Sequence, residues 1–200
     1  MSTLRVLYRD EDLLVIDKAS GRVVEGMDQS LEAQVRLEFD DRARALHRLD
    51  RGTSGVLAFS LRRLHHAAFV ELWEKRRVRK IYWAWVEGVW PASTLKLAGK
   101  DSEGREMDTT LRVLEQSTTR TLLELVPRTG RRHQLRLQCS QAGHPILGDQ
   151  RYGAASLPAI GFAIALHARR LEFVHPVLKT PLAFEAELPE TWKIFLTDAL

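Results

Sequence analysis

Asp50 lies where a carboxylate could do chemistry, in the run HRLDRGTSG. Arg48 and Arg51 flank it, and the hydroxyl residues Thr53 and Ser54 follow in a glycine-bounded loop. Nearby cations favour the charged form of a carboxylate, and glycines let a substrate approach the backbone closely. A charged carboxylate can stabilise positive charge on a sugar or trap the sugar covalently. An Asp in such a turn is more often a turn former or a salt-bridge partner, so spacing alone does not decide its role.

A second group of reactive residue types lies in residues 129–153, TGRRHQLRLQCSQAGHPILGDQRYG. If this stretch is helical, Arg132 and Arg136 stand four residues apart on one face, which suits a negatively charged partner. Its histidines and Cys139 do not have a standard zinc spacing, so the sequence predicts no metal site. Cys139 lies among apolar residues, which favours a packing role over that of a nucleophile.

The elements that must position these residues begin with a β-hairpin, predicted by two apolar runs around the polar turn at residues 10–12. Helices are predicted over 31–39, over 61–77 with Lys75, Arg76 and Arg77 in its last turn, from after Thr129 to Gly143, and after Pro189. The alternation of Leu135, Leu137 and Cys139 could equally indicate a strand, and the stop signal at Gly143 favours the helix. Further strands are predicted over 56–59, 81–88, 109–115, 121–126, 165–174 and 182–187.

These strands arrive in hairpins rather than in regular alternation with helices. The pattern predicts an α+β fold with a mixed, mainly antiparallel sheet flanked by helices. A Rossmann-type enzyme is disfavoured because no Gly-x-Gly-x-x-Gly follows the first strand.

The composition fits one compact domain, because 200 residues with 44% hydrophobic side chains can bury a sizeable core. No stretch approaches the roughly 20 apolar residues of a membrane span, and the N-terminus has no signal-peptide core. With a single cysteine, these features predict a cytoplasmic protein. The net charge is only +4, and the cations gather in two groups. Such groups occur equally on solvated helix faces and on surfaces that bind polyanions. They comprise Arg62, Arg63, Lys75, Arg76, Arg77, Arg79 and Lys80, and then Arg128, Arg131, Arg132 and Arg136.

Five segments in order are more specific than any single motif. They are VLYRDEDLLVIDKASG, LHRLDRGTSGVLAFS, RKIYWAWVEG, the 129–153 segment and LHARRLEFVHPVLKTPLAFEAELP. Together they resemble the RluA-type family of ribosomal and transfer RNA pseudouridine synthases over almost the whole chain. One departure is visible, because Ala19 stands in Lys18-Ala19-Ser20-Gly21 where the family usually has Pro, and this loosens a turn.

The resemblance implies an isomerase that converts uridine to pseudouridine at a flipped-out nucleotide, without metal or organic cofactor. It implies that Asp50 is the catalytic aspartate, that Tyr82 packs against the target base as a candidate for proton removal, and that Arg136 pairs with Asp50. Arg48 would help to displace the target nucleotide. Further RNA contacts are expected from Arg51, Arg79, Lys80, Arg131, Arg132 and His133.

The resemblance also bears on organisation and partners. Residues 1–200 are expected to form a single pseudouridine synthase catalytic domain without a separate N-terminal RNA-binding domain. The expected partner is ribosomal or transfer RNA, and the expected state is a monomer that does not associate with membranes.

Two alternatives stay open at this point. A catalytically silent RNA-binding module would bind RNA without changing any base. A nucleoside or glycoside hydrolase would use Asp50 with a second carboxylate as the acid and would release free uracil. The other carboxylates do not offer an obvious partner for this acid role; those considered are Glu71, Glu74, Asp101 and Asp149.

Overall fold

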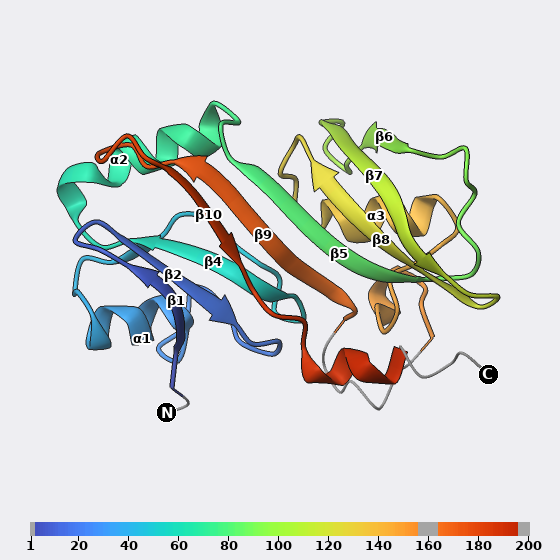
Figure 1. The fold of residues 1–200 in the computed structure, drawn as a ribbon, viewed down its shortest axis with the longest axis horizontal. Coiled ribbons are helices and arrows are strands. Elements are labelled where there is room, and N and C mark those ends of the chain that lie inside the picture. The colour runs from blue at the N-terminus through green and yellow to red at the C-terminus, as the bar shows by residue number, and fades with distance from the viewer. Residues whose placement is uncertain (1–2, 156–163, 196–200) are drawn as a thin grey trace. The chain divides into compact units, whose positions relative to one another are not determined.

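The computed structural model describes residues 3–155 and 164–195, coloured from blue to red in Figure 1. The chain divides into two compact units. Unit 1 consists of Met1–Lys80 and Ala168–Glu187, and unit 2 consists of Ile81–His167 and Leu188–Leu200. Strands β5 (Arg79–Glu87) and β9 (Leu166–Val174) contribute residues to both units.

Unit 1 begins with the predicted hairpin, which is confirmed. Strand β1 (Arg5–Arg9) pairs antiparallel with β2 (Leu13–Lys18). The carboxylate of Asp10 fixes the turn, because its Oδ1 accepts hydrogen bonds from the backbone N–H groups of Asp12 and Leu13, each at 2.8 Å. This Asx-type turn is the local reason for the chain reversal.

The other strands of unit 1 extend this sheet. Strand β4 (Ser54–Ser60) pairs antiparallel with β2 and with the two-residue β3 (Arg44–Ala45). Strand β10 (Pro181–Glu185) pairs antiparallel with β9. Every residue of β4 is buried, as the glycine-bounded apolar run predicts. Gly55 has φ +111°, and a Cβ at this position would lie 2.3 Å from the carbonyl oxygen of Ala168, so only glycine fits here.

Two predicted helices of unit 1 are confirmed. Helix α1 (Leu31–Glu38) begins at Ser30, whose Oγ accepts a hydrogen bond from the Ala33 N–H at 3.2 Å. Helix α2 (Arg63–Glu74) packs Phe69 and Leu72 into the core of this unit. It ends earlier than predicted, so Lys75, Arg76 and Arg77 lie beyond its last turn rather than in it. The helix stops because Arg76 adopts a left-handed conformation with φ 54°.

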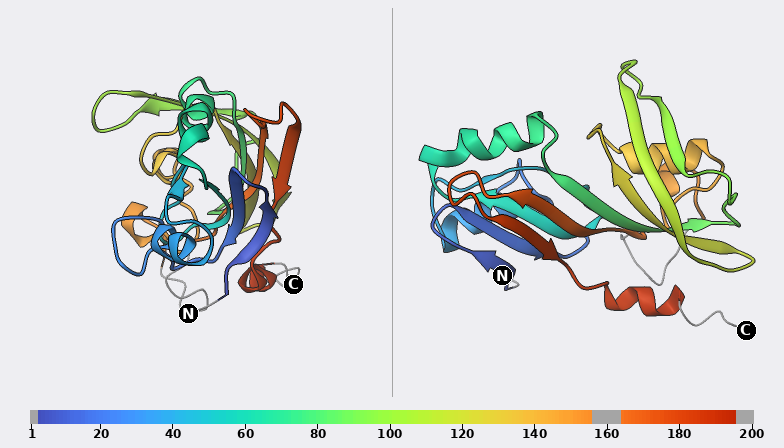
Figure 2. Two further views of the ribbon diagram at one scale, coloured as in Figure 1. Left: turned by 90° about the vertical axis from the view of Figure 1, so that its left-hand side faces the viewer. Right: turned by 45° about the horizontal axis from the view of Figure 1, so that its top comes forward.

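Unit 2 contains an antiparallel sheet in the order β5, β8 (Arg120–Pro127), β7 (Glu106–Gln116), β6 (Lys96–Lys100). Strand β6 has no counterpart in the sequence prediction. Helix α3 (Gln134–Gln141) packs against β6 (Figure 2). Gly143 follows the helix C-cap residue with φ 83°, as predicted.

Two helices of unit 2 differ from the prediction. Helix α3 begins only at Gln134, so Arg132 is not helical and does not share a helix face with Arg136. The last helix, Glu190–Phe195, is a 3-10 helix, and the first 3-10 helix covers Gln150–Tyr152. The Trp192 N–H donates to the Pro189 carbonyl at 2.8 Å, an i to i+3 bond that tightens this short segment.

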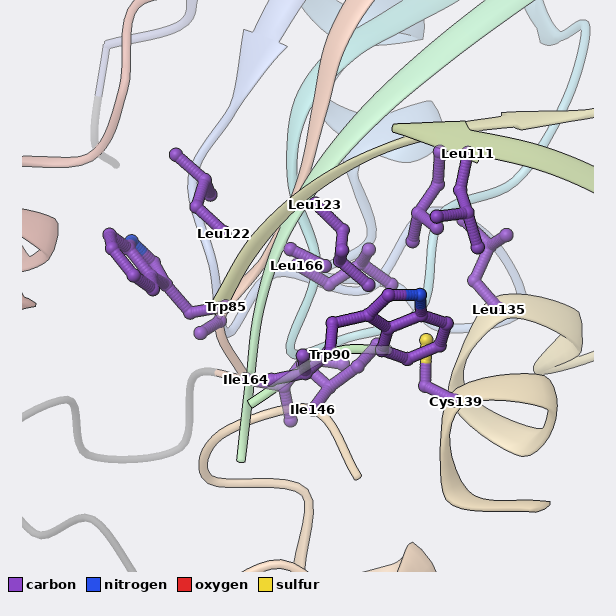
Figure 3. Close-up of a cluster of buried hydrophobic side chains, with 14 of the residues drawn as sticks. Trp85, Trp90, Leu111, Leu122, Leu123, Leu135, Cys139, Ile146, Ile164 and Leu166 are labelled. Carbon is purple, nitrogen blue, oxygen red and sulfur yellow. The ribbon is translucent and has the colours of Figure 1, made fainter. Parts of the chain in front are cut away.

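The core of unit 2 gathers around two tryptophans, Trp85 and Trp90 (Figure 3). The sulfur of Cys139 points from α3 toward Trp90, and the Cys139 side chain is fully buried. Burial, with a smaller contribution from Asp149, raises the pKa of the Cys139 thiol to about 12. Cys139 therefore stays a protonated thiol that packs in the core, as its apolar neighbours indicate.

The fold class is α+β with a mainly antiparallel sheet, as predicted. The described parts of the chain contain ten strands and three α-helices. In the same residues, no helix is long and apolar enough to cross a membrane.

Candidate active site

Asp50 belongs to unit 1 and lies in the turn that leads into β4. Its backbone carbonyl accepts a hydrogen bond from the Thr53 N–H at 3.0 Å, which closes residues 50–53 into a turn. Asp50 is half-buried, whereas Thr53 and Ser54 are buried. The turn thus places the carboxylate at the margin of a buried strand.

Lys18 holds this turn from inside the protein. Its side chain is fully buried, and its Nζ donates hydrogen bonds to the carbonyls of Thr53 (2.6 Å), Ala19 (3.2 Å) and Arg51 (3.2 Å). Burial lowers the pKa of Lys18 to about 8; Asp50 raises it and Arg22 lowers it further. The ammonium therefore stays protonated at neutral pH, and each of its three hydrogens has a carbonyl acceptor, including the carbonyl of the buried Thr53.

The residues after Lys18 complete a clamp on the same turn. Ser20 Oγ donates to the Gly52 carbonyl at 2.8 Å, and the Gly21 N–H donates to the Arg51 carbonyl at 2.8 Å. The Arg51 Nε donates in return to the Gly21 carbonyl at 3.1 Å. These hydrogen bonds fix the segment that carries Ala19, so its position does not depend on the ring of a proline.

His47 supports the same region as a neutral side chain. Its Nε2 accepts a hydrogen bond from the Ala58 N–H of β4 at 3.2 Å, and its ring stacks on Trp73 at 5.4 Å between centroids. Burial and then the charge of Lys80 lower the pKa of His47 to about 3. Nε2 can accept this hydrogen bond only when it is unprotonated, which is the state that the lowered pKa of His47 favours.

The lowered pKa of His47 predicts a loss of stability in acid. Unfolded His47 binds a proton near its ordinary pKa of 6.5, whereas folded His47 binds one only near 3, so its contribution is complete above 6.5 and declines as pH falls toward 3. Since the residue keeps some exposed area, we expect it to account for about 1–2 kcal/mol of the unfolding free energy lost between pH 7 and pH 5. Urea unfolding at both pH values measures this loss. His47→Gln keeps an acceptor and should lose less; equal losses in both proteins would refute the assignment.

In unit 2, Tyr82 lies on β5 opposite Leu125 of β8. It is half-buried and packs against the core cluster of this unit. The next residue, Trp83, donates its Nε1 hydrogen to Glu124 on β8 at 3.3 Å. Tyr82 therefore extends from a strand that is anchored at its neighbours, which suits an aromatic wall of fixed orientation.

Arg136 and Asp149 form a bidentate ion pair in unit 2. Nε and Nη2 of Arg136 donate to the two carboxylate oxygens of Asp149 at 2.6 and 2.7 Å. The side chains are only 11% and 1% exposed, so water does not screen this pair effectively. The guanidinium also lies 5.1 Å from the ring centroid of Tyr152. The carboxylate of Asp149 and the ring of Tyr152 both contact the planar guanidinium, so the Arg136 side chain has little rotational freedom.

Gln134 determines where α3 begins. Its buried amide accepts hydrogen bonds from Thr129 Oγ1 at 2.7 Å and from the Arg131 N–H at 3.0 Å. These contacts hold residues 129–131 in a turn, and His133 then adopts φ 55° at the helix N-cap. The ring of His133 contacts the hydroxyl of Tyr152 at 2.9 Å. The chain before Gln134 is therefore a folded loop and not the start of the helix predicted from after Thr129 to Gly143.

Comparison with known proteins identifies the family. Residues 12–141 match the family described as RNA pseudouridylate synthase. The chain belongs to this family. Among curated pseudouridine synthases, it is 31% identical to "Ribosomal large subunit pseudouridine synthase C" of Buchnera aphidicola subsp. Acyrthosiphon pisum, covering 98% of this chain and 71% of that protein. It is 30% identical to "tRNA pseudouridine synthase C" of Vibrio cholerae, over 98% and 95%.

The RluA-type resemblance is confirmed by a third relative, and a solved structure confirms the fold. "Dual-specificity RNA pseudouridine synthase RluA" of Vibrio cholerae is 32% identical over 86% of this chain and 77% of its own. The structure of "Human RNA Pseudouridylate Synthase Domain Containing 4" is similar with a TM-score of 0.77 and 25% identity, covering 94% of this chain and 90% of that one. The fold is thus that of the pseudouridine synthases.

The surface cations of this pseudouridine synthase differ in their partners. Arg48 is exposed and lies 3.7 Å from Glu25. Arg79 forms an ion pair with Glu172 at 3.2 Å. Arg131 donates its Nε hydrogen to the Glu106 carbonyl at 3.3 Å, and Arg132 is exposed. The predicted RNA contacts are therefore a mixture of paired and exposed side chains.

The structure groups the predicted site residues of the pseudouridine synthase unit by unit. Asp50 and Arg51 share one turn in unit 1, and Arg136 and His133 share Tyr152 as a partner in unit 2. The sequence indicated no positioning role for three residues that hold them: Lys18, Gln134 and Asp149. Lys18 closes the run LLVIDK two residues after its last apolar residue, and a lysine so close to an apolar run was the available signal. In the described ranges, no group of three or more His, Cys, Asp or Glu is placed to hold a metal ion.

Proposed function

We propose that this protein isomerises uridine to pseudouridine in ribosomal or transfer RNA. The observation that carries the proposal is Asp50 in a clamped turn of a chain that belongs to the pseudouridine synthase family. The names of its relatives include synthases of the large ribosomal subunit and of transfer RNA, which supports these two substrate classes.

In the proposed reaction, the bond between N1 of uracil and C1′ of ribose breaks, and the base rotates and rejoins C1′ through C5. C5 loses a proton and N1 gains one, so atoms balance without another reactant. Asp50 acts at the sugar, either as a nucleophile that forms an ester at C1′ or as a base. Tyr82 packs against the detached base and is a candidate to accept the C5 proton. A base that must not escape requires a closed and partly apolar site.

Arg136 supports Asp50 electrostatically in this proposal, and Asp149 is the positioning residue for Arg136. A guanidinium that is held bidentate by a buried carboxylate keeps one orientation. This fixed orientation costs no reorganisation when charge develops during the reaction.

Binding of RNA is proposed to use cations outside the reacting centre. Arg48 would help to hold the flipped nucleotide out of its stack. The other proposed contacts are Arg51, Arg79, Lys80, Arg131, Arg132 and His133. We further propose that residues 1–200 work as one catalytic domain, as a monomer and in the cytoplasm.

The test is to incubate the purified protein with unmodified transcripts of large-subunit ribosomal RNA and of transfer RNA. Nucleoside digestion and mass spectrometry, with chemical labelling of pseudouridine, are expected to find new pseudouridine without free uracil. Release of free uracil would instead identify a hydrolase. Binding of RNA without any change of base would identify a silent binding module.

A further inference from the structure

The turn that joins α2 to β5, together with the first two residues of β5, concentrates positive charge within unit 1. Figure 1 shows where α2 leads into β5. Five of the six residues from 75 to 80 are Lys or Arg, and the sixth, Val78, is buried. Lys75, Arg76, Arg77 and Arg79 are exposed, and Lys80 is half-buried. These cations differ in whether a carboxylate of the fold pairs with them.

Two of them are neutralised by carboxylates of the same unit. Lys75 pairs with Glu71 one helical turn earlier, and Arg79 pairs with Glu172 of β9. By contrast, no salt bridge involves Arg76, Arg77 or Lys80 among the residues that the structure describes. Arg77 contributes only a weak attraction to Glu71. Three cations of this turn thus lack a carboxylate in contact.

Lys80 lies in an environment that disfavours its charge. Burial lowers the pKa of Lys80, and the positive charge of Arg76 lowers it further. Lys80 in turn contributes to the lowered pKa of the buried His47. Cations that repel each other at the edge of a folded unit are relieved when an anion binds there.

Arg76 occupies a backbone position where glycine is the usual residue. The Arg77 N–H donates to the Leu72 carbonyl at 2.8 Å and the Arg76 N–H to the Trp73 carbonyl at 3.1 Å, the two bonds of a Schellman motif. Arg76 is the left-handed residue of this motif, with φ 54°. Because a Cβ strains this conformation, the fold would be served better by glycine, and the arginine side chain needs another explanation.

We propose that Arg76, Arg77 and Lys80 form a surface that binds phosphates of the RNA backbone. The inference rests on the proposed function for the identity of the polyanion. Lys and Arg at a surface turn recognise phosphates without reading base sequence, so this surface contributes affinity and register rather than choice of uridine. We expect Arg76 and Arg77 to contribute more to RNA affinity than Arg79, because Glu172 already neutralises the charge of Arg79.

Arg76→Gly separates RNA binding from folding, because the two readouts should move in opposite directions. The variant is expected to raise the thermal unfolding midpoint, since glycine relieves the left-handed backbone. Its affinity for a short fluorescent stem–loop RNA should fall about fivefold near 0.1 M salt, and the slope of log affinity against log salt should decrease by about one.

Lys179→Gly is the matched control, because Lys179 is an exposed lysine of unit 1 with φ 59°. It loses the same charge and relieves the same kind of backbone strain, but it should keep the wild-type salt slope. The proposal is overturned if both variants bind RNA alike. It is also overturned if Arg76→Gly weakens binding of polyglutamate and leaves RNA binding unchanged, since the surface would then serve an acidic protein. Binding is measured without turnover, so a lack of pseudouridine would count only against the proposed function.

Discussion

Asp50→Asn is expected to abolish pseudouridine formation, with a loss of at least about 10³-fold in kcat/KM, while RNA affinity stays within a few-fold of wild type. Asparagine has nearly the same shape and keeps the backbone carbonyl that closes the turn with Thr53. Its amide can act neither as a nucleophile nor as a base at the sugar. Single-turnover conversion of a uridine-containing transcript measures the chemical step, and filter binding measures affinity.

The control for this variant is Asp41→Asn, which removes the same charge from an exposed residue of the same unit and should behave as wild type. Because Asp50 raises the pKa of Lys18, urea unfolding of Asp50→Asn must also show an intact fold before activities are compared. Conversion by Asp50→Asn within tenfold of wild type would rule out Asp50 as the reacting carboxylate.

Local patterns predicted most of the elements that position the site. The turn at Asp10, the buried run of β4 and the stop signal at Gly143 each depend on residues that are neighbours in the chain. Such signals are carried by short-range backbone and side-chain contacts and can be recognised without the fold. The catalytic role of Asp50, by contrast, was predicted from the resemblance of the chain to a family and not from the residues around Asp50.

Contacts between distant residues could not be predicted in this way. Lys18 donates to the Thr53 carbonyl 35 residues later in the chain, and Arg136 pairs with Asp149 13 residues later. Neither separation follows from the repeat of a helix or a strand. The start of α3 was also misplaced, because His133 has no capping side-chain hydrogen bond and the determining contacts come from Gln134. Partners of this kind depend on the tertiary fold, so carboxylates and cations can be proposed from the sequence but not paired.

Lys18→Met is expected to lower the free energy of unfolding by about 2–4 kcal/mol and to reduce turnover. Methionine fills a similar volume, but it removes the ammonium donor from the carbonyl of the buried Thr53 and from that of the exposed Ala19. The Arg51 carbonyl keeps its second donor, the Gly21 N–H. The variant also removes the cost of burying a charge, so the loss of unfolding free energy stays below the cost of three unsatisfied acceptors. Urea unfolding measures this effect directly.

The same variant tests whether the clamp serves catalysis as well as folding. Lys18 does not contact the substrate in the proposed reaction, so its loss should act through the position of Asp50 in the turn that it holds. At low temperature, where Lys18→Met remains folded, we expect kcat to fall about tenfold with KM for RNA nearly unchanged, because a misplaced catalytic group impairs the chemical step rather than binding. Lys100→Met removes an exposed lysine and should change neither stability nor kcat. Wild-type kcat in folded Lys18→Met would show that the clamp serves stability alone and that the turn positions Asp50 without it.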